Sequence, residues 1–239
     1  MRTAAILPVK RFASAKQRLG ASVSESLRLE LARAMLSDVL AALAETTAIE
    51  LTIVVTREES VAALAAAHGA LVVEDVADAG QSAAAELGIG RALASGIERV
   101  LCVPGDCPAL EPSELDALLD AGAGEPRRPA DSREVVIVPD RHGTGTNGLL
   151  LCPCDAITPS FGPGSCERHR ALALAAGLRC RVERLPSLLL DIDTGADLAV
   201  LRERLAADRP DAGPARARRT REVLGAQDGA LARPLTTSA

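Results

Sequence analysis

Aromatic residues are almost absent from this chain of 239 residues, which has no Trp, no Tyr and only two Phe. Polynucleotide-binding domains normally show a basic excess or an aromatic platform on which bases stack. This sequence has neither, since its formal net charge at pH 7 is −5. We therefore expect no nucleic acid among its partners.

Long hydrophobic runs are also missing, although 48% of the residues are hydrophobic. No stretch approaches the roughly 18 apolar residues of a membrane span. The apolar N-terminal stretch, residues 3–9, is short and is followed at once by Lys10 and Arg11, which is not the pattern of a signal peptide. We therefore expect a cytoplasmic protein with no membrane partner.

The six cysteines form no pair of CxxC motifs. Zinc ribbons and small disulfide-stapled domains depend on such regular spacing, so neither is predicted. Most of the cysteines lie in hydrophobic segments, and we interpret them as small core residues.

Short apolar runs alternate with longer amphipathic segments along most of the chain. This alternation is typical of an α/β fold, in which a mostly parallel central sheet is flanked by helices. The predicted strands span residues 3–7, 51–56, 70–74, 99–103, 135–138, 148–152, 180–185 and 188–192. The first predicted helix ends near residue 43, and the others span residues 58–68, 81–95, 112–121, 165–176 and 194–206. The first and last of them carry capping-box patterns, Ser22 with Glu25 and Thr194 with Asp197.

The apolar periodicity stops near residue 208, and Arg, Ala, Pro, Gly and Thr dominate the remaining sequence. Such a composition buries too little apolar surface to offset the entropy lost on ordering. We therefore expect a single folded domain over residues 1–207 and a flexible C-terminal tail over residues 208–239.

Basic residues are concentrated in the loop after the first predicted strand, which carries Lys10, Lys16 and Arg18. In an open parallel sheet, ligands bind beyond the carboxyl ends of the strands. Fixed cations there suit the charge that develops on a nucleoside triphosphate during nucleotidyl transfer. The alternative is a solvated basic loop, which is disfavoured because the only two lysines of the chain lie in this one segment.

Three aspartates predict a magnesium site. Asp106 follows the predicted strand 99–103, and Asp191 and Asp193 are two residues apart, so they lie on one side of an extended segment. Mg²⁺ takes one or two carboxylates and completes its shell with phosphate oxygens and water. The alternative roles are turn capping for Asp106 and helix capping for Asp193.

Two glycine-rich turns, residues 139–147 and 161–165, predict a second anion site. Their glycines permit the backbone to approach an anion closely, and Thr146 and Ser165 offer hydroxyl groups. Ser165 also begins a predicted helix, whose free amides attract negative charge. The other polar side chains nearby in the sequence are His142, Asn147 and His169. A lone histidine is more often a surface or packing residue.

The chain contains five distinctive segments, which are, in order, PVKRFASAKQRL, VPGDCPAL, VPDRHGTGTN, FGPGS and LDIDT. Together they resemble the phosphoenolpyruvate or 2-phospho-L-lactate guanylyltransferase family of coenzyme F420 biosynthesis. The resemblance covers residues 1–206 and implies a nucleotidyltransferase fold of the GT-A-like type. It also implies that a phosphate oxygen of phosphoenolpyruvate attacks the α-phosphorus of GTP with Mg²⁺ present, giving enolpyruvoyl-diphospho-guanosine and pyrophosphate.

The resemblance also assigns roles to individual residues. It implies that phosphoenolpyruvate is contacted by Thr146 or its neighbour Asn147, by Gly162 and by Ser165. It implies that the metal-binding carboxylates are Asp106, Asp191 and Asp193. It implies that the triphosphate loop contains Lys10, Lys16 and Arg18. One departure concerns the nucleoside, because Gln81 and Ser82 begin a helix where members of the family usually carry a Leu-Asn pair.

The implied reaction needs no general base, because a phosphate monoester is already ionised at neutral pH. Two alternatives remain open for the acceptor, 2-phospho-L-lactate and 3-phosphoglycerate, which also carry a phosphate and a carboxylate. A third alternative is a nucleotide-sensing module without turnover, which the presence of Lys10, Lys16 and Asp106 disfavours.

Overall fold

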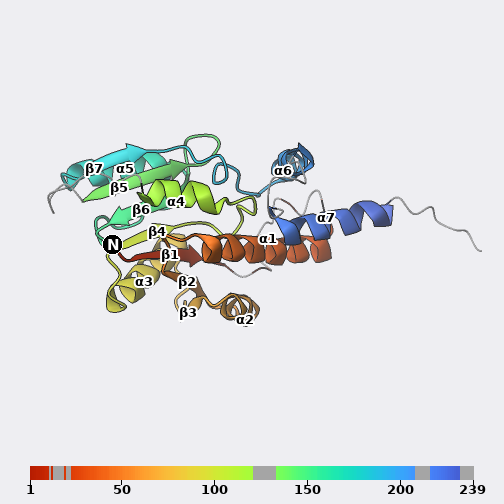
Figure 1. The fold of residues 1–239 in the computed structure, drawn as a ribbon, viewed down its shortest axis with the longest axis horizontal. Coiled ribbons are helices and arrows are strands. Elements are labelled where there is room, and N and C mark those ends of the chain that lie inside the picture. Colours follow the sequence, from red (N-terminus) through yellow and green to blue (C-terminus); the bar gives the residue numbers. More distant parts are fainter. Residues whose placement is uncertain (11, 13–18, 20–22, 121–132, 208–215, 232–239) are drawn as a thin grey trace, which may run out of the picture.

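The computed structural model describes residues 1–10, 12, 19, 23–120, 133–207 and 216–231. Their central feature is a seven-stranded sheet with the order β3-β2-β1-β4-β6-β5-β7 (Figure 1). The strands are β1 Thr3–Pro8, β2 Leu51–Thr56, β3 Leu71–Glu74, β4 Arg99–Cys102, β5 Glu134–Pro139, β6 Thr146–Cys152 and β7 Arg179–Val182. All neighbouring pairs are parallel except those of β6 with β4 and β5. The predicted α/β fold with a mostly parallel sheet is confirmed.

Helices cover both faces of this sheet. They are α1 Glu25–Glu45, α2 Glu59–Ala67, α3 Gln81–Ala94, α4 Pro112–Asp120, α5 Ser165–Ala175, α6 Gly195–Ala207 and α7 Arg218–Leu231. Because successive strand residues point to opposite faces, Ala5 and Leu7 of β1 pack in the core beneath α1, α2 and α4, whereas Ala4 and Ile6 pack against α3. Helices α6 and α7 lie beyond the carboxyl end of β1 (Figure 1).

The order of the strands creates an opening at one edge of the sheet. After β1 the chain continues to β2 on one side, and after β4 it continues to β5 on the other side, although β1 and β4 are neighbours. Such a switch point leaves a crevice beyond the strand ends where ligands bind. Because β6 is antiparallel to β4, with Cys102 opposite Leu149, the first residues of β6 also lie at this edge.

The predicted strand at residues 188–192 is wrong, since the structure has a turn and an extended loop there. Leu188, Leu190 and Ile192 are buried, so the apolar run reports packing and not a strand. Its backbone is satisfied by loop and side-chain partners: the Ile192 N–H donates to the carbonyl of Asp106, and the Leu188 carbonyl accepts from Asn147. Because the segment crosses the end of the sheet, it has no strand to pair with.

Helix α1 starts later than the Ser22 capping box predicts. Its cap is Ser24, whose hydroxyl accepts a hydrogen bond from the Leu27 N–H, while Ser22 lies outside the described residues. The second capping box is confirmed, because Thr194 and Asp197 exchange hydrogen bonds between side chain and backbone at the start of α6. The predicted strand 148–152 begins earlier, at Thr146, so Thr146 and Asn147 belong to β6 and not to the preceding loop.

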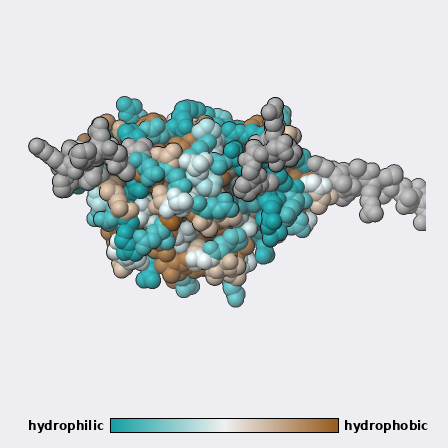
Figure 2. Space-filling model, viewed as in Figure 1, coloured by the Kyte–Doolittle hydropathy of each residue, from teal (hydrophilic) through white to brown (hydrophobic). Residues whose placement is uncertain are grey.

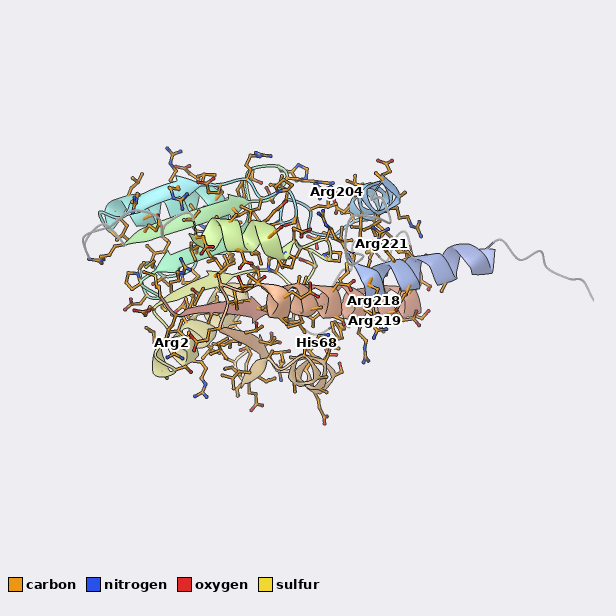
Figure 3. All side chains as sticks on the ribbon, in the orientation of Figure 1. Arg2, His68, Arg204, Arg218, Arg219 and Arg221 are labelled. Atoms are coloured by element: carbon orange, nitrogen blue, oxygen red, sulfur yellow. The ribbon has the colours of Figure 1, made fainter. Side chains whose placement is uncertain are left out.

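Helix α7 lies within the predicted flexible tail, so the prediction of flexibility is wrong for this part of the chain. The N-terminal N–H groups of α7, from Arg219 and Thr220, donate to the carboxylate of Asp38 in α1, as does the Thr220 hydroxyl. Leu224 of α7 is buried in a cluster with residues of α1 and α6. The basic side chains labelled on α6 and α7 lie around this junction (Figure 3). Sequence periodicity missed the helix because its docking depends on a carboxylate far away in the chain.

The surface and the cysteines agree with the composition. On the face drawn in Figure 2, hydrophilic and hydrophobic residues are intermixed.

Four of the six cysteines are buried, namely Cys102, Cys107, Cys152 and Cys154, and the other two are half-buried. The interpretation as core residues is therefore confirmed for four of them. In the part of the chain that the structure describes, no helix combines the length and the apolar character that crossing a membrane requires.

We expect Asp38→Ala to lower the free energy of unfolding by about 1–2 kcal/mol, because α7 loses the carboxylate that accepts its first N–H groups. For a domain of this size the melting temperature should fall by about 2–8 °C. Thermal denaturation followed by circular dichroism measures the shift, with Glu30→Ala on the exposed side of α1 as the control. If Asp38→Ala melts with the wild type, this carboxylate does not hold α7.

Candidate active site

A pocket of about 620 Å³ opens at the carboxyl edge of the sheet. Every predicted site residue that the structure describes lines it, namely Lys10, Asp106, Thr146, Asn147, Gly162, Ser165, Asp191 and Asp193. Lys16 and Arg18 lie outside the described residues. The structure therefore brings together side chains from five separate segments, as the end-of-strand argument predicts.

Lys10 lines the pocket, and Phe12, two residues further on, is a buried aromatic residue. Phe12 is only 5% exposed and packs in the core beneath α1. Its N–H donates to Glu58 at 2.6 Å, and its carbonyl accepts from the guanidinium of Arg28 at 3.1 Å. Leu19 is fully buried in the cluster of α1, α6 and α7. Sequence reasoning identified the cations but missed these supports.

The aspartates of two loops, Asp106, Asp191 and Asp193, line the pocket together. Burial raises the pKa of Asp191, the negative charge of Asp106 raises it further, and the hydrogen bond from Asn147 opposes both effects. Asn147 donates from Nδ2 to Asp191 at 3.1 Å and to the Leu188 carbonyl at 2.7 Å. Its amide therefore positions the loop that carries Asp191, which is a different role from contacting a substrate.

The residues present fit a divalent cation. Bringing half-buried carboxylates together is costly unless a cation is shared between them. Mg²⁺ needs only one or two carboxylates when phosphate oxygens and water supply the rest. Within the described ranges no three His, Cys, Asp or Glu side chains form a ligand set by themselves. The charge of Asp106 raises the pKa of Asp191 more than the charge of Asp193 does.

The loop after Asp191 is held by the start of α6. The buried carboxylate of Asp197 accepts hydrogen bonds from the N–H groups of Asp193 and Thr194, at 3.1 and 2.7 Å. Its other oxygen forms an ion pair with Arg141 of the β5–β6 turn. This ion pair connects the acidic loop to the glycine-rich β5–β6 turn.

The β5–β6 turn needs its glycines. Asp140 accepts from the Thr144 N–H at 3.0 Å and folds the turn back on itself. A Cβ at Gly145 would lie 2.6 Å from the Asp140 carboxylate, and Gly143 has a φ of 76°. Larger residues at these two positions would therefore clash or strain the backbone.

The turn before α5 is fastened from both sides. Gly162 and Gly164 have positive φ angles of 109° and 73°. The guanidinium of Arg168 donates to the carbonyls of Ser160, Phe161 and Pro163, while the Phe161 N–H donates to Ser82 of α3. Sequence reasoning missed Arg168. Its position four residues after the turn could have indicated this role, because a helical side chain there points back toward the N-terminus of the helix.

A buried chain of hydrogen bonds connects the two turns. Thr146 Oγ1 lies 3.1 Å from His169 Nδ1 and 3.0 Å from Ser165 Oγ, which donates to it. His169 is fully buried, and its pKa is lowered to about 4 by burial and by the charge of Arg168, so the ring is neutral at pH 7. The expectation that a lone histidine is a surface or packing residue is met, since His169 is a packing residue whose ring forms a T-shaped contact with the ring of Phe161.

The far end of the pocket is lined by residues that sequence reasoning did not propose. They are Val55, Asp75, Asp78 and Ala84, and Gln81, at the helix start that the resemblance associates with the nucleoside, also lines the pocket. Asp75 directly follows β3 and is 7% exposed. The rule that ligands bind beyond strand ends could have found Asp75, because β3 is one of the predicted strands.

Known proteins resemble the chain in both sequence and structure. The family model described as "Guanylyl transferase CofC like" matches residues 3–202. The phosphoenolpyruvate guanylyltransferase of Conexibacter woesei is 49% identical over 90% of this chain and 94% of its own length. The 3-phospho-D-glycerate guanylyltransferase of Phenylobacterium zucineum is 35% identical over 92% of this chain and 94% of its own length.

Solved structures share the fold at low identity. A protein from Desulfovibrio desulfuricans G20, named as a nucleotide-diphospho-sugar transferase, has a TM-score of 0.71 at 17% identity, and 96% of each chain is covered. A nucleotidyl transferase from Methanothermobacter has a TM-score of 0.58 at 21% identity, covering 85% of this chain and 97% of its own. The nucleotidyltransferase fold expected from the sequence is confirmed, and the chain belongs to the family of CofC-like guanylyl transferases.

Proposed function

We propose that this protein transfers GMP from GTP to phosphoenolpyruvate, giving enolpyruvoyl-diphospho-guanosine and pyrophosphate. One observation carries the proposal: a single pocket is lined by a lysine, a pair of carboxylates, two glycine turns and the residues Thr146 and Ser165 beside them. The names of the relatives, most of them phosphoenolpyruvate guanylyltransferases, support the same reaction.

The pocket has two ends, which we assign to the two substrates. GTP would lie at the end formed by Lys10 and by the loops after β2 and β3, where Asp75 is available to accept hydrogen bonds from the guanine edge. The acceptor would lie between the glycine turns, near Thr146, Gly162 and Ser165. Asp106, which follows β4, stands between the two ends because β4 lies between β1 and β6 in the sheet.

Magnesium fits this assignment. Asp106 and Asp191 would hold the ion, with Asp193 nearby, and phosphate oxygens would complete its shell. When bound, Mg²⁺ would supply positive charge to the phosphate oxygens of the nucleotide.

The protein's own residues would act by positioning and by neutralising charge. The acceptor phosphate is already ionised, so no side chain needs to remove a proton before it attacks the α-phosphorus. Lys10 would offset the charge that develops on the triphosphate as pyrophosphate leaves. The predicted partners in that loop, Lys16 and Arg18, would share this task.

Release of pyrophosphate tests the reaction and separates the alternatives. GTP with Mg²⁺ is incubated in turn with phosphoenolpyruvate, 2-phospho-L-lactate and 3-phosphoglycerate, and we expect the highest kcat/KM with phosphoenolpyruvate. The name of the Phenylobacterium relative makes 3-phosphoglycerate the specific second candidate. GTP binding without turnover of any acceptor would favour a nucleotide-sensing module.

We expect Asp106→Asn to reduce kcat by at least about a hundredfold and to raise the Mg²⁺ concentration needed for the remaining activity, because a neutral amide is a weaker ligand than a carboxylate. Initial rates across a magnesium titration measure both effects. Asp155→Asn removes the same charge from an exposed site outside the pocket and serves as the control. An unchanged magnesium dependence would reassign Asp106 to turn capping.

We expect Lys10→Ala to reduce kcat by about a hundredfold, the scale on which one donor to transition-state charge contributes. Lys10→Arg should recover little, because a planar guanidinium does not replace a compact ammonium in a tight phosphate site. Steady-state rates at saturating GTP and acceptor check both variants. A Lys10→Ala enzyme with wild-type kcat would mean that the exposed lysine is only solvated.

We expect Thr146→Val to weaken acceptor binding by about 10- to 150-fold, because the valine keeps the shape but loses a hydrogen bond to a charged group. Calorimetric titration of GTP with Mg²⁺ should give an unchanged affinity. Thr47→Val, in the exposed turn after α1, is the matched control. Equal losses for GTP and for the acceptor would show that Thr146 belongs to the nucleotide end.

A further inference from the structure

The hydrogen bonds of His169 define which of its ring nitrogens carries the proton. The backbone N–H of Ser160 can only donate, and it lies 2.8 Å from Nε2, so Nε2 is the unprotonated nitrogen. A neutral imidazole has one N–H, which must then be on Nδ1. Nδ1 therefore donates to the Thr146 oxygen 3.1 Å away.

Counting the hydrogen bonds of the Thr146 hydroxyl leaves its own proton without an assigned partner. A threonine hydroxyl can accept two hydrogen bonds and donate one. Its two acceptor positions receive the Nδ1–H of His169 and the hydroxyl proton of Ser165. The proton of the Thr146 hydroxyl must point elsewhere, and Thr146 lines the pocket.

We propose that His169 is a positioning residue that, as the Nδ1–H tautomer, turns Thr146 into a fixed hydrogen-bond donor toward the anionic acceptor. The inference rests on the proposed function, since it assumes that the acceptor binds between the glycine turns. The group that the donor would meet is an oxygen of the phosphate or the carboxylate of the acceptor. His169 itself stays behind Thr146, fully buried, and does not reach the pocket.

The orientation matters because a hydroxyl that is free to rotate can also present its lone pairs. Lone pairs directed at a phosphate or carboxylate would repel it, whereas the proton attracts it. The donors from His169 and Ser165 occupy the lone pairs of the Thr146 oxygen before the ligand binds. The hydroxyl therefore needs no reorientation on binding. Ser165 contributes the second of these donors and therefore acts on the acceptor partly through Thr146.

A matched pair of substitutions tests the tautomer-specific role. Asn places its amide N–H where the histidine ring has Nδ1, so His169→Asn keeps the donor to Thr146. Gln is one methylene longer and places its amide where the ring has Nε2, so His169→Gln keeps a partner for Ser160 and loses that donor. We expect KM for the acceptor to rise by about 3- to 12-fold in His169→Gln and by less than about threefold in His169→Asn, with KM for GTP unchanged in both.

A double-mutant cycle shows whether the effect passes through Thr146. In a Thr146→Val background there is no hydroxyl to orient, so His169→Gln should cause no further rise in the acceptor KM. The same KM in the Asn and Gln variants, an undiminished effect of His169→Gln on top of Thr146→Val, or an equal rise in KM for GTP would each overturn the proposal.

Nuclear magnetic resonance of the unsubstituted protein gives a readout that does not depend on activity or on the variants folding. The chain has three histidines, and long-range proton–nitrogen correlations distinguish the two neutral tautomers of each ring. His68→Gln and His142→Gln assign the His169 signals by elimination. We expect the His169 proton on Nδ1 at pH 7, and a proton on Nε2 would overturn the proposal. A protein with the expected tautomer that uses no phosphorylated acid would contradict the proposed function instead.

Discussion

Antiparallel pairing of β6 with β4 brings the start of one strand to the end of the other at the edge of the sheet where ligands bind. In an all-parallel sheet the first residues of β6 would lie at the opposite edge. Here Thr146 and Asn147 lie beside the loop that carries Asp106. The reversal of one strand therefore assembles the acidic centre and the glycine turns into one pocket.

The pocket is held in shape by buried polar side chains, most of which do not contact solvent. Asn147 supports Asp191, Asp197 supports the loop around Asp193, and His169 supports Thr146. Each buried donor or acceptor that is satisfied in this way stiffens the segment it contacts, because leaving it unsatisfied would cost free energy. The chemistry proposed here depends on positioning, which such a network provides.

Sequence patterns and structure diverge where distant segments interact. The apolar run 188–192 looks like a strand because burial in a loop and burial in a strand select the same residues. The predicted tail contains α7 because Asp38, on α1, accepts the first N–H groups of that helix. Helix α7 has few apolar residues of its own, so no local pattern indicates where it packs.

The α/β class, most strands and helices, and the residue types of the site are predictable from the sequence, because hydrophobic periodicity and short motifs are local properties of the chain. Lys10 and Asp106 are also predictable as site residues, because each follows a predicted strand. The contacts between distant segments appear only in the folded protein, where Asn147 holds a loop and both His169 and Ser165 contact the Thr146 hydroxyl. These roles depend on hydrogen bonds between residues up to 44 positions apart in the chain, and the direction of a hydrogen bond is set by the three-dimensional arrangement of its partners.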